Sequence, residues 1–149
     1  MSDAETPTII QYAGDEYFIA TTPSGCAQTI DVQGGRHAAP GPLELFLAGL
    51  GSCTAADVIS ILHKKREPVT GYRVEIRTLR REEHPRAFRR IELKHVVRGV
   101  HVSAASVERA IALSTDKYCS AVATVRATAE VVTTFAIEEE SAPGPGVAG

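Results

Sequence analysis

The sequence is poor in the residues that nucleic-acid binding and disulfide-stabilised folds require. It contains no tryptophan, four tyrosines and four phenylalanines among 149 residues. Its 16 Lys and Arg are balanced by 18 Asp and Glu, which leaves a net charge of -2. Single-strand binding needs stacking rings in a basic groove, and duplex binding needs an excess of basic charge. The composition therefore argues against a nucleic-acid partner.

Cysteine is also scarce, and the three present are Cys26, Cys53 and Cys119. The first residues, MSDAETP, are acidic and polar, so we expect no signal peptide and a cytoplasmic location. Structural disulfides are rare there, and an odd cysteine count does not build a disulfide framework. Three roles therefore remain possible for these cysteines: packing as buried side chains, metal binding and thiol catalysis. No C-x-x-C spacing occurs, and the spacing does not support a zinc site that adds His37 or His95, so no metal is predicted.

The longest apolar run is PLELFLAGLGSCTAADVISILHKK, residues 42–65, with Cys53 at its middle. Pro42 suits a first helical turn, and the basic residues at the other end suit a helix C-terminus. Its apolar side chains point in nearly every direction, which predicts a helix buried all round. The run approaches the length of a membrane span, but Glu44 and Asp57 interrupt it. We therefore expect a core helix wrapped by sheet, and no membrane association.

The rest of the chain alternates between strand-like and helix-like segments. Strands are expected at 8–12, 16–21, 26–32, 69–80, 88–100 and 125–137; a second helix is expected at 103–118 and a further helical turn at 120–124. This order lacks a βαβ alternation, so we predict an α+β fold with a mostly antiparallel sheet. Residues 1–137 are expected to form a single domain, followed by a disordered tail at 138–149.

Thiol chemistry is one of two interpretations of Cys53 and Cys119. Free cysteines often pack as small buried hydrophobes. Alternatively, the two form a redox pair, in which one thiolate attacks and the other resolves, with Arg36 in the loop 33–41 as the cation that lowers a thiol pKa. Glu44 either orients an arginine or complements the helix dipole. His95 shares a strand face with apolar residues, which favours a core histidine over a ligand.

Two segments, GPLELFLAGLGSCTAADVISIL and TDKYCSAVATV, resemble the OsmC/Ohr family of osmotically inducible and organic hydroperoxide resistance proteins. The first is most similar to a less characterised OsmC-like branch, in which P-x-E-L leads into G-x-C-(S/T)-A. The second helix ending in KYCS is similar to the same branch. The resemblance covers residues 7–137.

The resemblance implies the OsmC-like fold, an intertwined homodimer with antiparallel sheets around the central helices, and two active sites at the dimer interface. It implies that the Cys53 thiolate attacks an organic hydroperoxide, releasing an alcohol and leaving a sulfenic acid. Cys119 then forms a disulfide with Cys53, and a dithiol reduces it. No metal, flavin or other cofactor is implied. Cys26 has no counterpart in this scheme, and we expect it to be structural.

The sequence departs from the well-characterised peroxidases at one position. They carry Glu directly after the helix-starting proline, where this chain has Leu43. Glu44 follows one residue later, about 100° around an ideal helix. Arg36 matches the region that supplies the family's activating arginine. Two alternatives to a peroxidase remain: a protein that binds a small lipid-like ligand and senses redox state, and a structural dimer with inert thiols.

Overall fold

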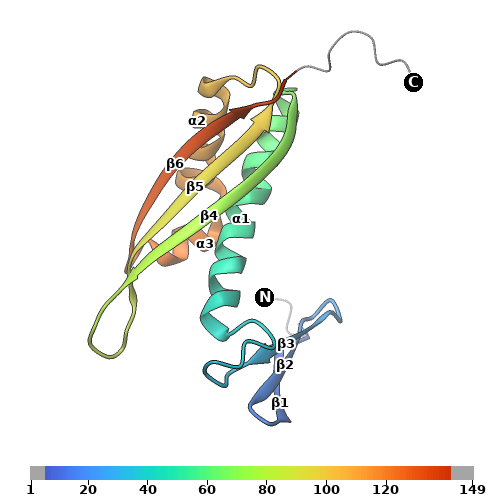
Figure 1. Ribbon diagram of the computed structural model, residues 1–149, viewed down its shortest axis with the longest axis vertical. Helices are drawn as coiled ribbons and strands as arrows, with labels where there is room; N and C mark the ends of the chain where they lie inside the picture. The colour runs from blue at the N-terminus through green and yellow to red at the C-terminus, as the bar shows by residue number, and fades with distance from the viewer. Residues whose placement is uncertain (1–5, 142–149) are drawn as a thin grey trace. The chain divides into compact units, whose positions relative to one another are not determined.

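The computed structural model describes residues 6–141 (Figure 1). The chain divides into two compact units, one up to Ala48 and one from Gly49 onward. Helix α1, Pro42–Lys64, begins in the first unit and continues in the second. Each unit is described by itself, and the single domain expected from the sequence stays a prediction.

The first unit contains a three-stranded antiparallel sheet in the order β1-β2-β3. Its strands are β1 (Ile9–Gly14), β2 (Tyr17–Thr21) and β3 (Ala27–Asp31). Asp15 and Glu16 connect β1 to β2, and both have positive φ angles, as tight hairpin turns require. The predicted hairpin and third strand are confirmed. Cys26 is exposed just before β3, so its thiol does not pack in a core, contrary to the structural role expected for it.

Helix α1 confirms the predicted long helix, but not its burial. Its buried residues are Leu50, Gly51, Thr54, Val58 and Leu62. They recur about every four residues and form one stripe, because the helix contacts its own chain on one side. The prediction of a helix buried all round is therefore wrong for a single chain. By length and composition alone, α1 is also long and apolar enough to cross a membrane, a property shared by core helices of soluble proteins.

The second unit contains a sheet in the order β4-β5-β6. Strands β4 (Val69–Arg80) and β5 (Phe88–Gly99) are antiparallel, as predicted. Strand β6 (Glu130–Glu139) runs parallel to β5, with His95 opposite Phe135. The expectation of no βαβ connection is wrong here. Parallel neighbours require a long crossover, and the helices between β5 and β6 provide it.

The crossover consists of α2 (Ala104–Leu113), a π-helical turn η1 (Ser114–Tyr118) and α3 (Ser120–Val125). Ser103 caps α2 by accepting a 3.2 Å hydrogen bond from the Ser106 amide. The helix and the additional turn were both predicted. The strand predicted from Val125 begins only at Glu130, because α3 extends through Val125. Strand β6 continues to Glu139, past the predicted start of the tail at 138, and residues 142–149 lie outside the described part.

The helices cover one face of the β4-β5-β6 sheet (Figure 1). A buried apolar cluster joins them to β5. Its members are Val58, Leu62, Val97, Val102, Val107, Ala110 and Ile111. Burying each large aliphatic side chain stabilises the fold by about 1.5–3 kcal/mol. His95 is fully buried on the same face of β5 as Ile91 and Leu93, which confirms the prediction of a core histidine.

Candidate functional site

The structure brings together the two cysteines predicted to react. Cys53 is partly exposed in the middle of α1, whereas Cys119 is only 3% exposed between η1 and α3. Both are free thiols, and Cys53 is a close enough neighbour of Cys119 to raise the pKa of its thiol. Burial raises the pKa of the Cys119 thiol, the neighbouring Cys53 raises it further, and the Val122 amide opposes both effects. The pair therefore combines an accessible thiol with a sheltered one.

The backbone around Cys119 holds its thiol in one place. The Cys119 amide donates a 2.8 Å hydrogen bond to the Ser114 carbonyl, which closes the π-helical turn. Cys119 then caps α3, and its Sγ accepts a hydrogen bond from the Val122 amide at 3.4 Å. Single π-helical turns are common at functional sites. Here the turn sets the position from which Cys119 faces Cys53.

A buried polar group beside the cysteines was missed by the sequence analysis. The hydroxyls of Thr54 and Ser114 lie 2.8 Å apart, and Ser114 Oγ donates to Asp57 Oδ2 at 2.9 Å. Thr54 and Ser114 are fully buried. The available signal was the spacing of Thr54 and Asp57, which lie one helical turn apart in an otherwise apolar run. Their partner Ser114 is 60 residues from Thr54 in sequence, so only the fold reveals the connection.

Arg36 is held tightly within the first unit. Its guanidinium donates to Asp31 at 2.8 and 2.9 Å and to Asp15 at 3.1 Å, and it stacks on the Tyr17 ring at 3.8 Å. The Arg36 guanidinium holds the pKa of the Asp31 carboxyl well below its usual range, despite the opposing effect of burial. Arg36 therefore lies in the predicted loop, and these contacts fix its side chain there.

Glu44 accepts a 3.0 Å hydrogen bond from the Gly41 amide at the start of α1. This contact satisfies an amide at the helix N-terminus and places a negative charge at the positive end of the dipole. Within residues 6–141, Glu44 forms no ion pair with Arg36, which is engaged by Asp31 and Asp15 instead. Both residues belong to the first unit, so their roles at the thiols stay predictions.

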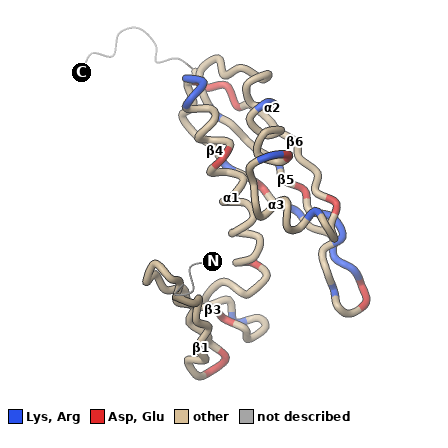
Figure 2. The backbone as a smooth tube through the Cα atoms, turned by 180° about the vertical axis from the view of Figure 1, so that it is seen from behind, with Lys and Arg blue, Asp and Glu red and all other residues tan. Residues whose placement is uncertain are grey.

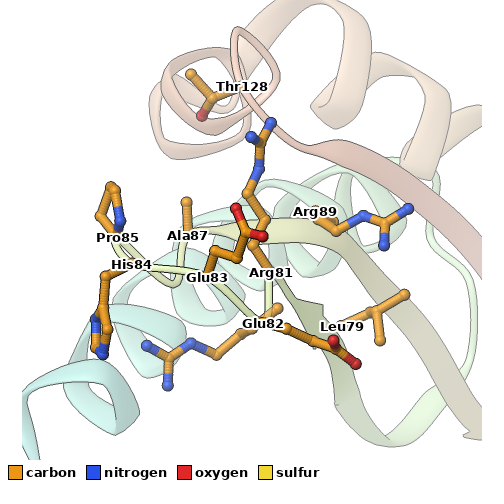
Figure 3. A pocket seen from close by; sticks show the side chains of 10 residues that line it. Leu79, Arg81, Glu82, Glu83, His84, Pro85, Ala87, Arg89 and Thr128 are labelled. Atoms are coloured by element: carbon orange, nitrogen blue, oxygen red, sulfur yellow. The ribbon is translucent and has the colours of Figure 1, made fainter.

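A hollow of about 640 Å³ lies at the turn between β4 and β5 (Figure 3). Charged side chains, including Arg81, Glu83 and Arg89, surround it, and Figure 2 shows basic and acidic segments side by side there. Neither cysteine lines this hollow. Within the described part of the chain, no three His, Cys, Asp or Glu side chains converge on a possible metal position. The thiol pair is therefore the candidate site.

Comparison with known proteins gives the family. The sequence profile described as OsmC-like protein matches residues 34–134, about two thirds of the chain. The chain belongs to the OsmC-like family. The matched segment of this OsmC-like protein contains Cys53 and Cys119, and it also contains Arg36 and Glu44. The resemblance seen in the two cysteine segments is thereby confirmed.

Individual relatives agree with this family and differ in how closely they match. Protein YhfA of Escherichia coli (strain K12) is 42% identical over 103 residues, covering 69% of this chain and 76% of YhfA. A hypothetical protein from Aquifex aeolicus VF5 is 30% identical, with a TM-score of 0.80 over 91% of this chain and 97% of that protein. An organic hydroperoxide resistance protein OsmC from Legionella pneumophila, at 16% identity, has a TM-score of 0.63 over 90% of this chain and 99% of that protein. The last likeness shows the fold alone.

Proposed function

We propose that this OsmC-like protein is a thiol peroxidase that reduces organic hydroperoxides to alcohols. The observation that carries the proposal is that a partly exposed Cys53 and a buried Cys119, both free thiols, are neighbours in the fold. Membership of the OsmC-like family supports it, as does the shared fold of proteins named for organic hydroperoxide resistance.

The reaction divides into an attack, a resolving step and a reduction. The Cys53 thiolate attacks the terminal peroxide oxygen, breaks the O–O bond and, with one proton, releases an alcohol and leaves Cys53–SOH. Cys119 then forms the S–S bond with Cys53 and releases water. An external dithiol restores both thiols by exchange. Cys53 is the attacking residue because it is the more exposed, and the raised pKa of Cys119 suits a thiol that reacts second.

Arg36 and Glu44 enter the proposal through the family resemblance. A guanidinium near a thiol favours the thiolate, so Arg36 is assigned to activating Cys53 and Glu44 to orienting Arg36. In the first unit, Arg36 is engaged by Asp31 and Asp15. Activation of Cys53 therefore requires Arg36 to act from this anchored position or to exchange partners.

The proposed active unit is a homodimer. Large apolar side chains of β1 remain exposed in one chain: Ile9 by 50%, Ile10 by 57% and Tyr12 by 57%. A three-stranded sheet with so much exposed apolar surface gains stability by packing against a second surface. A second copy of the chain provides such a surface, and it would also cover the sides of α1 that a single chain leaves open.

The test is to mix reduced protein with cumene hydroperoxide and follow the thiols by mass spectrometry. We expect a Cys53–Cys119 disulfide in the unmodified protein and a trapped sulfenic acid on Cys53 in Cys119→Ser. Cys53→Ser should be inert, and Cys26→Ser is the matched control that should react normally. The apolar composition of α1 as a whole favours an organic substrate, so hydrogen peroxide should react more slowly. No thiol oxidation at excess peroxide would refute the proposal and favour a ligand-binding protein.

A further inference from the structure

The hydrogen bonds of Ser114 have a defined direction. Asp57, when ionised, can only accept, so the Ser114 hydroxyl donates its single hydrogen to Asp57 Oδ2 at 2.9 Å. The Thr54 hydroxyl must then donate to Ser114 Oγ, 2.8 Å away. Ser114 is fully buried, so water cannot replace either partner. The three side chains form one directed chain that joins η1 to α1.

This chain of hydrogen bonds connects the surroundings of both cysteines. Thr54 is the next residue after Cys53 on α1. Ser114 begins the π-helical turn, and its carbonyl accepts the Cys119 amide at 2.8 Å. The Ser114 side chain therefore holds α1 while its backbone holds Cys119. Among the contacts of the described residues, this is a direct path from the helix of one thiol to the backbone of the other.

We propose that Ser114 is the positioning residue of the resolving step, aligning Cys119 with the Cys53 sulfenic acid through its bonds to Thr54 and Asp57. This inference rests on the proposed peroxidase function. In that step, Cys119–SH and Cys53–SOH become a disulfide and water, with the thiol proton leaving in the water. Such an internal reaction depends steeply on geometry, and a misplacement of about 1 Å can cost on the order of a hundredfold in rate. Attack on the peroxide by Cys53 does not involve Cys119.

The test measures sulfenic acid formation and disulfide formation separately in Ser114→Ala. The rate of sulfenic acid formation is measured with organic hydroperoxide in the Cys119→Ser background, with and without Ser114→Ala. It should change by less than about twofold. Disulfide formation with Cys119 present should slow by roughly tenfold to a hundredfold. Cys53 should then accumulate as sulfinic acid at high peroxide, because the sulfenic acid waits longer for its partner.

Thr115→Val is the matched control. Thr115 is the neighbouring residue, and its hydroxyl is buried without a hydrogen-bond partner within residues 6–141. Thr115→Val should form the disulfide at the normal rate. Thr54→Val removes one of the two side-chain hydrogen bonds of Ser114, so it should slow disulfide formation, but by a smaller factor than Ser114→Ala does. The equilibrium between disulfide and dithiothreitol should shift toward the reduced protein by a similar factor in Ser114→Ala.

The outcomes distinguish this inference from the proposed function. If Ser114→Ala forms the disulfide as fast as the unmodified protein, or if Thr115→Val is slowed equally, Ser114 is not a positioning residue although the peroxidase reaction stands. If Ser114→Ala does not fold, as shown by circular dichroism, the rate in Thr54→Val decides. If Cys119→Ser gives no sulfenic acid at all, the proposed function itself fails.

Discussion

The Tyr72 hydroxyl lies 2.6 Å from Nδ1 of His95, and the two rings stack with an angle of 9° between their planes. The bond joins β4 to β5 on the side of the sheet where Tyr72 packs against the buried cluster shared with the helices. Burial lowers the pKa of His95 to about 4, and burial and the charge of Asp57 raise the pKa of Tyr72. Both side chains are therefore neutral over the physiological pH range.

The pKa of His95 makes stability depend on pH. The unfolded state binds a proton on His95 below its ordinary pKa of 6.5, whereas the folded state does so only below about 4. The free energy of unfolding should therefore fall as pH drops from about 6.5 to 4, by up to about 3 kcal/mol, and level off below. Urea denaturation at a series of pH values measures this slope.

His95→Phe tests the assignment. This variant should be less stable at pH 7, since the Tyr72 hydroxyl loses its partner at a cost of about 1–3 kcal/mol. Its free energy of unfolding should no longer show the decrease between pH 6.5 and about 4 that His95 causes. His63→Gln, at an exposed position of α1, should retain the full slope. An unchanged slope in His95→Phe would contradict the explanation.

Gly99 ends β5 where the chain packs against itself. A Cβ atom there would collide with the Pro68 carbonyl oxygen and with Cγ2 of Val102. Gly99→Ala should therefore destabilise the protein by about 2 kcal/mol or more, because a backbone atom cannot move aside cheaply. Gly71→Ala on β4, whose Cβ would lie an ordinary 3.4 Å from Arg98, should cost no more than about 0.5 kcal/mol. Thermal denaturation of the two variants makes the comparison, and equal stability would refute the predicted collision.

Asp31 organises the loop that leads into α1. Its carboxylate accepts hydrogen bonds from the amides of Gln33 at 3.0 Å and Ala38 at 3.1 Å, besides those from Arg36. Asp31→Ala should speed hydrogen exchange of these two amides by about tenfold or more, since they lose a charged acceptor. Asp15→Asn should have little effect, because Asp15 is an exposed partner of Arg36. Unchanged exchange in Asp31→Ala would show that other contacts hold the loop.

The exposed side chains of β1 predict how the dimer can be broken. Ile10→Lys places a charge on the apolar surface proposed to meet a second copy, and it should weaken self-association by roughly tenfold or more. Gln11→Lys changes the opposite face of the same strand, which carries only Ile9 of the three exposed apolar side chains, and should weaken association less than Ile10→Lys. Sedimentation velocity should give twice the mass of one chain for the unmodified protein. The mass of a single chain at all concentrations would exclude the dimer.

Local patterns in the sequence determined most of the elements. Proline at the start and basic residues at the end predicted α1, since both act within one helical turn. Alternation along β4 and β5 correctly predicted their antiparallel pairing and the buried side of His95. The two cysteine segments were specific enough to indicate the family, although neither cysteine spacing nor composition could.

Only the tertiary structure decided the features that depend on distant contacts. The parallel placement of β6, the burial of only one stripe of α1 and the start of β6 at Glu130 all result from packing that no local period encodes. The same is true of the partners of Arg36, which are two aspartates rather than Glu44. The sequence indicated only that Asp57 interrupts an apolar helix, whereas the fold places Ser114 against both Asp57 and Thr54. Burial forces such polar groups to find partners, and the partner is chosen by proximity in space rather than in sequence.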